Sequence, residues 1–425
     1  MGAAKAAIHN ELVRGYADEL NIHDREGVRA RIATLTKDYL ERSNGSVSQL
    51  DYEYLVEALL DEVLGLGALQ PLLEDPEISE IMINNPRQVY VERGGRMTLS
   101  PVVFEGPAQL RNVIDRIVTS IGRRVDESSP MCDARLRDGS RVNIVLPPLA
   151  LDGPCMTIRK FSAEKLGPND LLTMGAATVE MIQFLQASVH SRLSVVVSGG
   201  TSSGKTTLLN ILSSFIPADE RIVTVEDTAE LQLRQEHVVR LESRPPNVEG
   251  AGAVAIRDLV RNSLRMRPDR IIVGECRGGE TLDMLQAMNT GHEGSMSTIH
   301  ANSAYDALSR LETMILMTGA DMALRAIQKH IASAIDVIVQ TERVHGGARK
   351  IVSIAEITGL GHDGIQLQEL FRFRQTGVDK EGNAEGFHTA TGHPSVHLEH
   401  FAERGETLPL MVFKPTARAG GAAAS

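Results

Sequence analysis

The sequence predicts an α/β fold in which a doubly wound parallel sheet forms the largest domain. Apolar runs of strand length alternate with helical stretches after residue 170, and a glycine-rich loop joins one run to a helix start. Strands that alternate with helices form parallel sheets, because each helix crosses over between neighbouring strands. The candidate strands are Ser194–Ser198, Arg221–Glu226, Arg270–Gly274, Ser295–Ile299 and Val337–Thr341, and the runs Lys350–Ile357 and Ile365–Arg374 extend the sheet.

Two smaller regions are expected before this domain. Residues 1–70 have a helical pattern, with apolar side chains at three-and-four spacing at Val56, Leu59, Leu60, Val63 and Leu64. Residues 71–161 predict an α+β domain, since one helix (Leu110–Ile121) lies among the short β-type runs Ile81–Ile83, Gln88–Val91, Arg141–Leu146 and Met156–Ile158. A linker at 162–170 leads to the α/β domain at 171–376, and residues 377–425 are expected to be a polar extension and tail.

The composition argues against several classes of protein. A net charge of −11 over 425 residues does not suit general binding of nucleic acid. Cys132, Cys155 and Cys276 are too scattered for a disulfide framework or a zinc module, which suits a reducing compartment. No run is long and apolar enough to span a bilayer, and the N-terminus lacks the apolar core of a signal peptide. We therefore expect a cytoplasmic protein that meets the membrane through partners.

The glycine-rich loop has the pattern of a phosphate-binding loop. Gly199–Thr206 reads GGTSSGKT and matches G-x-x-x-x-G-K-[ST] at every fixed position. Its backbone N–H groups would form an anion nest, Lys205 would reach the β- and γ-phosphates, and Thr206 would hold Mg²⁺. The alternative, a glycine-rich turn with a chance lysine, lacks a reason for the strand before it and the helix after it. The predicted nucleotide-binding residues are Gly199, Gly200, Thr201, Ser202, Ser203, Gly204, Lys205, Thr206 and Thr207.

Two predicted strands end in carboxylates. Asp227 follows the strand that ends in Glu226, and Glu275 follows Gly274, which stands where many such segments have aspartate. Because ligands of doubly wound sheets lie beyond the carboxyl ends of the strands, these acids should reach the same edge as Lys205. Carboxylates there can hold Mg²⁺ or activate the attacking water, so Glu226 and Glu275 are candidates for both roles. Solvated strand ends are the alternative, and which glutamate is the general base stays open.

Two histidines flank one of the predicted strands. His292 precedes Ser295–Ile299 and His300 follows it. An imidazole beside a triphosphate can sense the γ-phosphate through a hydrogen bond. A single histidine would more often be structural, but two that flank one strand beside two acidic strand ends favour a role at the site.

Four segments in order resemble the motifs of one superfamily. GGTSSGKT, VTVEDTAELQL, LRMRPDRIIVGECRGGE and NTGHEGSMSTIHANS look like the Walker A, Asp box, Walker B and His box of the type II/type IV secretion ATPases. The flanking segments LGLGALQPLL, ISEIMINNP and ELFRFRQTGVD place the resemblance closest to the CpaF-type (TadA-type) ATPases of Tad/Flp pilus assembly.

The resemblance implies a fold and an assembly. It implies a RecA-like C-terminal domain after an α+β, PAS-like N-terminal domain, in a ring of six identical subunits that binds ATP and Mg²⁺ between the two domains. Arginines of the N-terminal domain would reach the γ-phosphate, and the matching residues look like Arg141 and Arg159. A guanidinium there would neutralise charge that develops on the transferring phosphoryl group.

The resemblance also implies a function. The leading interpretation is a Mg²⁺-dependent ATPase motor at the cytoplasmic face of the bacterial inner membrane. It would power pilus assembly, with retraction left open, through an inner-membrane platform protein. The alternative is a type IV secretion ATPase for conjugation or effector export, which shares all four boxes. A nucleic-acid translocase fits less well, because the chain is acidic and lacks a basic stretch with interleaved aromatics. A non-hydrolysing regulator is disfavoured by the complete boxes.

A zinc site is not expected. Some relatives carry a four-cysteine zinc insert, which three scattered cysteines cannot form. The C-terminal region holds four histidines without a strong ligand pattern, so a solvated tail is the expectation for His388, His393, His397 and His400.

Overall fold

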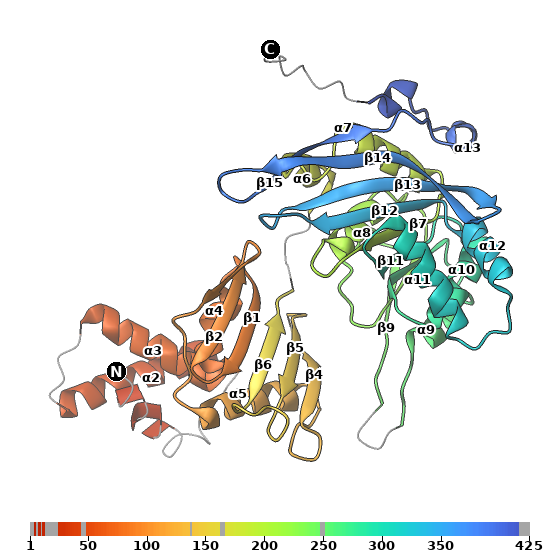
Figure 1. The fold of residues 1–425 in the computed structure, drawn as a ribbon. Helices are drawn as coiled ribbons and strands as arrows, with labels where there is room; N and C mark the ends of the chain where they lie inside the picture. The colour runs from red at the N-terminus through yellow and green to blue at the C-terminus, as the bar shows by residue number, and fades with distance from the viewer. Residues whose placement is uncertain are drawn as a thin grey trace, which may run out of the picture. The chain divides into compact units, whose positions relative to one another are not determined.

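The chain forms two compact units, residues 1–163 and residues 164–425 (Figure 1). In this computed structural model the described residues are 4–5, 7–9, 11–12, 24–43, 48–136, 138–161, 166–246 and 251–415. Within these ranges, no helix has both the length and the apolar character needed to cross a membrane.

The first unit begins with packed helices, α2 (Arg25–Arg42) and α3 (Gln49–Leu64). The hydroxyl of Ser48 caps α3 by accepting the backbone N–H of Asp51 at 3.1 Å. The predicted apolar face of α3 is present: Val56, Leu59 and Leu60 are buried, and Val63 and Leu64 pack against them from partly exposed positions. Short turns of helix follow at η1 (Gly67–Leu69) and α4 (Gln70–Glu74).

The described part of the first unit also contains a six-stranded antiparallel sheet. Its order is β3-β2-β1-β6-β5-β4, and apolar residues of α5 (Pro107–Ser120) share a buried core with it. The sequence did not indicate β3 or β4, because every residue of β3 is exposed and the edge strand β4 buries only Cys132. The strands are β1 (Ile78–Asn85), β2 (Gln88–Arg93), β3 (Arg96–Leu99), β4 (Met131–Arg135), β5 (Arg141–Val145) and β6 (Cys155–Arg159).

The second unit is built on a larger sheet, nine-stranded in its described part. Its order is β15-β14-β13-β12-β7-β11-β10-β8-β9. The strands from β12 to β9 are parallel, and β13, β14 and β15 add to β12 in antiparallel fashion. The strands are β7 (Val195–Gly199), β8 (Ile222–Glu226), β9 (Val238–Glu242), β10 (Arg270–Cys276), β11 (Met296–His300), β12 (Val337–Arg343), β13 (Arg349–Gly361), β14 (Gly364–Val378) and β15 (Ala384–Ala390).

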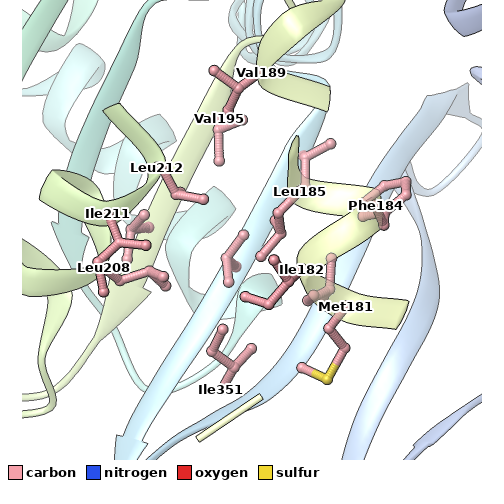
Figure 2. Packing of buried hydrophobic residues seen from close by; sticks show 14 of the residues in the cluster. Met181, Ile182, Phe184, Leu185, Val189, Val195, Leu208, Ile211, Leu212 and Ile351 are labelled. Atoms are coloured by element: carbon pink, nitrogen blue, oxygen red, sulfur yellow. The ribbon is translucent and has the colours of Figure 1, made fainter. Parts of the chain in front are cut away.

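Helices cover both faces of this sheet because its strands are apolar on both sides. Val195 and Val197 of β7 join one core cluster while Val196 joins the other. Helices α7 (Val179–His190) and α8 (Lys205–Ser213) contribute to the first cluster, as Figure 2 shows. The second cluster takes residues from α9 (Ile256–Ser263), α10 (Glu280–Asn289), α11 (Ala304–Leu316) and α12 (Leu324–Ala334). The short α6 (Pro168–Thr173) precedes α7.

The C-terminal region packs into the second unit, so the expectation of a solvated tail is wrong for His388, His397 and His400, although it holds for His393. After β15, Phe401 of α13 (Leu398–Glu403) and Phe413 of η2 (Leu410–Phe413) are buried against Phe184. His388 and His400 bond to the carbonyls of Ile351 and Ser191, and His397 is half-buried, whereas His393 is exposed. The misinterpretation arose because few apolar residues, widely spaced, make these contacts.

Candidate active site

The phosphate-binding loop connects β7 to α8, as its sequence predicts. Ser202 and Gly204 have the left-handed values φ 56° and 95°, and Ser203 lies between them. Alternation of backbone handedness points successive N–H groups to one side and forms an anion-binding concavity. Gly199 is needed at the base of the loop, because a Cβ there would lie 2.5 Å from the carbonyl oxygen of Thr341.

The lysine of the loop makes contacts to its own backbone. Its Nζ donates to the carbonyls of Gly199 and Gly200 at 3.0 and 2.7 Å. The Thr206 hydroxyl, in the first turn of α8, donates to a carboxylate oxygen of Glu230 at 3.4 Å. Glu230 follows β8 and was not singled out from the sequence, although it stands four residues after Glu226 in the same acidic segment.

Glu226, the last residue of β8, is buried and only partly satisfied. It is 3% exposed, and its Oε2 accepts the backbone N–H groups of Glu230 and Leu231 at 2.6 and 2.9 Å. Its Oε1 has no hydrogen-bond partner within the described ranges. Burial raises the pKa of this carboxyl against the lowering effect of the two N–H bonds. Glu226 therefore holds the segment that carries Glu230 through Oε2, while Oε1 has no partner among the described residues.

Gly274 on β10 makes room for Glu226. A Cβ at this position would lie 2.9 Å from Cγ of Glu226. The aspartate that many such segments carry would therefore collide with the neighbouring strand end. The departure from the common pattern has a steric cause.

Glu275 follows on β10 and pairs with an arginine. Its Oε2 accepts from Arg277 at 2.6 Å, and Arg277 also lies 3.6 Å from Asp227. The side chain of Glu275 is 24% exposed, so it can meet water more readily than Glu226. Arg277 thus joins the acidic ends of β8 and β10, a contact that the sequence pattern does not indicate.

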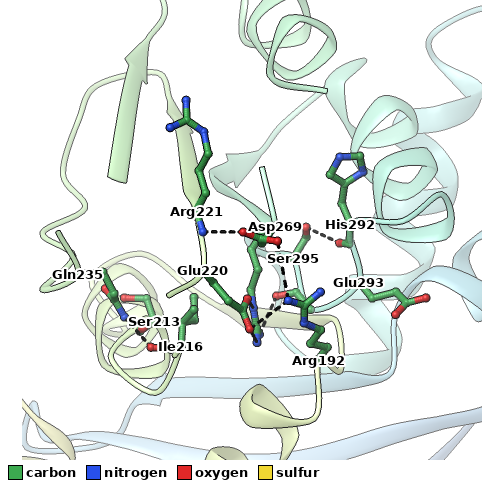
Figure 3. Close-up of polar contacts among 12 residues, drawn as sticks. Arg192, Ser213, Ile216, Glu220, Arg221, Gln235, Asp269, His292, Glu293 and Ser295 are labelled. Atoms are coloured by element: carbon green, nitrogen blue, oxygen red, sulfur yellow. Dashed lines mark hydrogen bonds and ion pairs between the residues drawn. The ribbon is translucent and has the colours of Figure 1, made fainter. Parts of the chain in front are cut away.

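The structure separates the two predicted histidines. His300 ends β11 and is in register with Gly199, at the edge of the sheet that carries the phosphate loop. His292 lies before the first residue of β11, at the opposite edge, where the Ser295 hydroxyl donates to its carbonyl (Figure 3). The expectation that both histidines lie at the site is therefore wrong for His292 within one subunit. His292 precedes β11 and His300 ends it, and the two ends of an extended strand lie on opposite sides of the sheet.

Arg141 and Arg159 are neighbours in the first unit. They begin β5 and end β6, directly opposite each other in the antiparallel ladder. Arg159 also lies 3.7 Å from Glu80 of β1. Opposed like charges destabilise a sheet unless anionic groups compensate them. The pair lies where β5 begins and β6 ends, with Glu80 beside Arg159, and its role toward the phosphates stays a prediction.

Comparison with known proteins identifies the family. The family model of the type II/IV secretion system protein matches residues 62–368. A Mycobacterium tuberculosis (strain H37Rv) protein named for conjugal transfer is 36% identical over 341 residues, which are 75% of this chain and 96% of the relative. The conjugal transfer protein TrbB of Rhizobium radiobacter is 34% identical, covering 70% of this chain and 88% of the relative.

A type IV secretion protein and one solved structure are also similar to this chain. The type IV secretion system protein PtlH of Bordetella pertussis is 36% identical, covering 69% of this chain and 95% of the relative. The crystal structure of the pilus retraction motor PilT with bound ADP has a TM-score of 0.50 at 18% identity, covers 69% of this chain and 82% of its own, and supports the fold alone. The chain belongs to the type II/IV secretion system protein family and is a P-loop ATPase.

Proposed function

We propose that this chain is the ATPase motor of a type IV secretion or conjugation apparatus. The observation that carries the proposal is the 36% identity to a relative named for conjugal transfer over 96% of that relative's length. The type IV secretion protein PtlH matches to the same degree. Pilus assembly, the leading expectation from the sequence, is the second candidate, and it rests on the flanking segments of the resemblance. The relatives' names favour secretion.

ATP is proposed to bind with its phosphates in the loop from Gly199 to Thr206. When ATP binds, Nζ of Lys205 would leave the loop carbonyls and bind the β- and γ-phosphates, because phosphate oxygens carry a full negative charge and carbonyl oxygens only a partial one. Mg²⁺ prefers oxygen ligands, and Thr206, Glu230, Glu226 and Glu275 supply only oxygens. When bound, the ion would neutralise charge on the phosphate oxygens.

We assign the general base to Glu275 and a holding role to Glu226. Glu275 is accessible to water and is oriented by Arg277, whereas Oε2 of Glu226 is committed to two backbone N–H groups. His300, in register with Gly199, is proposed to sense the γ-phosphate.

The two units are proposed to act as a clamp in a ring of six subunits. The second unit would be the RecA-like half, and the first, with its antiparallel sheet, the PAS-like half that offers Arg141 and Arg159 to the γ-phosphate. Loss of the γ-phosphate would remove a shared ligand and favour opening. The ring would work at the inner face of the inner membrane, with a membrane protein of the apparatus as its partner and without direct binding of nucleic acid.

A deletion strain tests this proposal. The strain is scored for conjugal or effector transfer and for surface pili, and is complemented with the wild-type gene or with Lys205→Ala. We expect transfer to fail and to return only with the wild-type gene. Normal transfer with lost pili would replace secretion by pilus assembly. Normal transfer and normal pili would exclude both.

A further inference from the structure

The hairpin formed by β12 and β13 touches the phosphate loop at two consecutive residues. Thr341, near the end of β12, meets Ser203, and Arg349, the first residue of β13, meets Ser202. The hairpin belongs to the junction between the parallel strands and the antiparallel extension, far from the loop in sequence.

The contact made by Arg349 holds a strained residue, Ser202. Ser202 has φ 56°, a left-handed conformation that costs free energy for any residue with a Cβ. Nε of Arg349 donates to the carbonyl of Ser202 at 3.0 Å. The stem of Arg349 lies over the next turn of the loop, since its Cδ would be 3.4 Å from a Cβ at Gly204. Arg349 therefore stabilises the handedness that gives the loop its anion nest.

The contact made by Thr341 fixes the base of the loop. Thr341 is 4% exposed, and its hydroxyl donates to the carbonyl of Ser198 at 3.1 Å. The hydroxyls of Thr341 and Ser203 lie 3.0 Å apart, and Ser203 also reaches the carbonyl of Gly200 at 2.9 Å. The threonine thus ties the last residues of β7 to the middle of the loop.

We propose that Arg349 and Thr341 are positioning residues that hold the phosphate loop in its nucleotide-binding form before ATP arrives. A preorganised site loses less free energy on binding than a loop that must be ordered by its ligand. The loop binds phosphates in the ground state and in the transition state alike, so loosening it weakens nucleotide affinity and leaves turnover at saturation near the wild-type value. The inference rests on ATP binding and not on the transport role.

The test measures the Kd for ADP and the kcat and KM for ATP with the purified full chain. Arg349→Ala removes the bond to the carbonyl of Ser202, and Thr341→Val removes both hydroxyl contacts, to Ser198 and to Ser203. We expect Kd and KM to rise about tenfold in each variant, as the loss of hydrogen bonds of this kind implies. The matched control is Arg374→Ala, because Arg374 is an exposed arginine of β14, which pairs with β13 on the side away from β12. Arg349→Lys and Thr341→Ser keep a donor and a hydroxyl, and should recover most of the affinity.

Folding is followed by the melting temperature without nucleotide. A purely structural role would lower that temperature in Arg349→Ala and Thr341→Val and leave the Kd of the folded protein unchanged. That result would overturn the proposal, as would an affinity of Arg349→Ala for ADP equal to that of Arg374→Ala. If Thr341→Val does not fold, the comparison of Arg349→Ala, Arg349→Lys and Arg374→Ala decides.

Discussion

Buried charged groups at the amino ends and at the carboxyl ends of the parallel strands in the second unit differ in how fully they are hydrogen-bonded. At the amino ends, the fully buried Arg270 donates twice to Glu220, at 2.6 and 3.1 Å, and once to the carbonyl of Gly294. Arg192 approaches the same glutamate at 3.3 Å (Figure 3). At the carboxyl ends Glu226 is almost as buried, yet one of its oxygens has no hydrogen-bond partner in the part of the chain that the structure describes.

This difference separates a structural charge from a functional one. A buried charge that the fold satisfies completely has nothing left for a ligand. A carboxylate kept with an unused oxygen and a raised pKa is the arrangement found at catalytic sites. Glu220 and Glu226 are both buried, and of these two carboxylates only Glu226, at the carboxyl ends of the strands, keeps an oxygen without a partner among the described residues.

The largest expected effect comes from breaking the amino-end pair. Arg270→Met leaves Glu220 buried with only the partly exposed Arg192, and should lower the free energy of unfolding by roughly 3 kcal/mol. Chemical denaturation of the variant measures the loss. The double variant Arg270→Met/Glu220→Met removes both charges and should regain most of the stability. Equal stability of the single variant and the wild type would contradict this view of the pair.

The next effect comes from the carboxyl ends. Glu226→Gln keeps an acceptor for the two backbone N–H groups and removes the negative charge that we propose helps to hold Mg²⁺, so we expect ATP turnover to fall about 100-fold while stability holds or rises. Glu275→Gln should lower turnover at least as much and leave ATP binding intact. Steady-state hydrolysis, nucleotide binding and thermal unfolding at pH 7 measure these. Full turnover in Glu275→Gln would move the general base elsewhere.

The smallest expected effect concerns Asp336, a carboxyl at the amino ends of the strands whose burial is only partly offset by hydrogen bonding. Asp336 accepts the N–H of Ser194 at 2.7 Å, yet burial raises its pKa from 3.8 to about 6. The folded state therefore binds the proton more tightly than the unfolded state, and stability falls as pH rises from about 4 to about 6. Above this window the charged form costs up to about 2 kcal/mol, after allowance for partial exposure.

Asp336→Asn keeps an acceptor for Ser194 and does not titrate. Between pH 4 and pH 6 the free energy of unfolding of this variant should not show the decrease that Asp336 causes in the wild type. At pH 7 it should therefore exceed that of the wild type. Denaturation at a series of pH values measures the difference. Parallel pH profiles of the two proteins would show that Asp336 contributes nothing.

Local sequence was sufficient for the phosphate loop and for the strands around it. The strand, the glycines and the helix start of Gly199–Thr206 are adjacent in the chain, and the five predicted parallel strands are all present. The strands β9 and β15 were not predicted; each lies at an edge of the sheet, where β9 buries none of its side chains fully and β15 buries only its last two residues. Glu230 was missed because its role depends on the fold of the segment after β8.

By itself, the sequence determined the chemistry of the phosphate loop and the two acidic strand ends, because spacing along one strand–loop–helix unit places those groups. Only the tertiary structure decided which charges remain unsatisfied, which histidine lies at the phosphate edge, and that Thr341 and Arg349 hold the loop. These properties depend on pairing between strands that are distant in the chain. A linear pattern does not record register, burial or the approach of a neighbouring backbone.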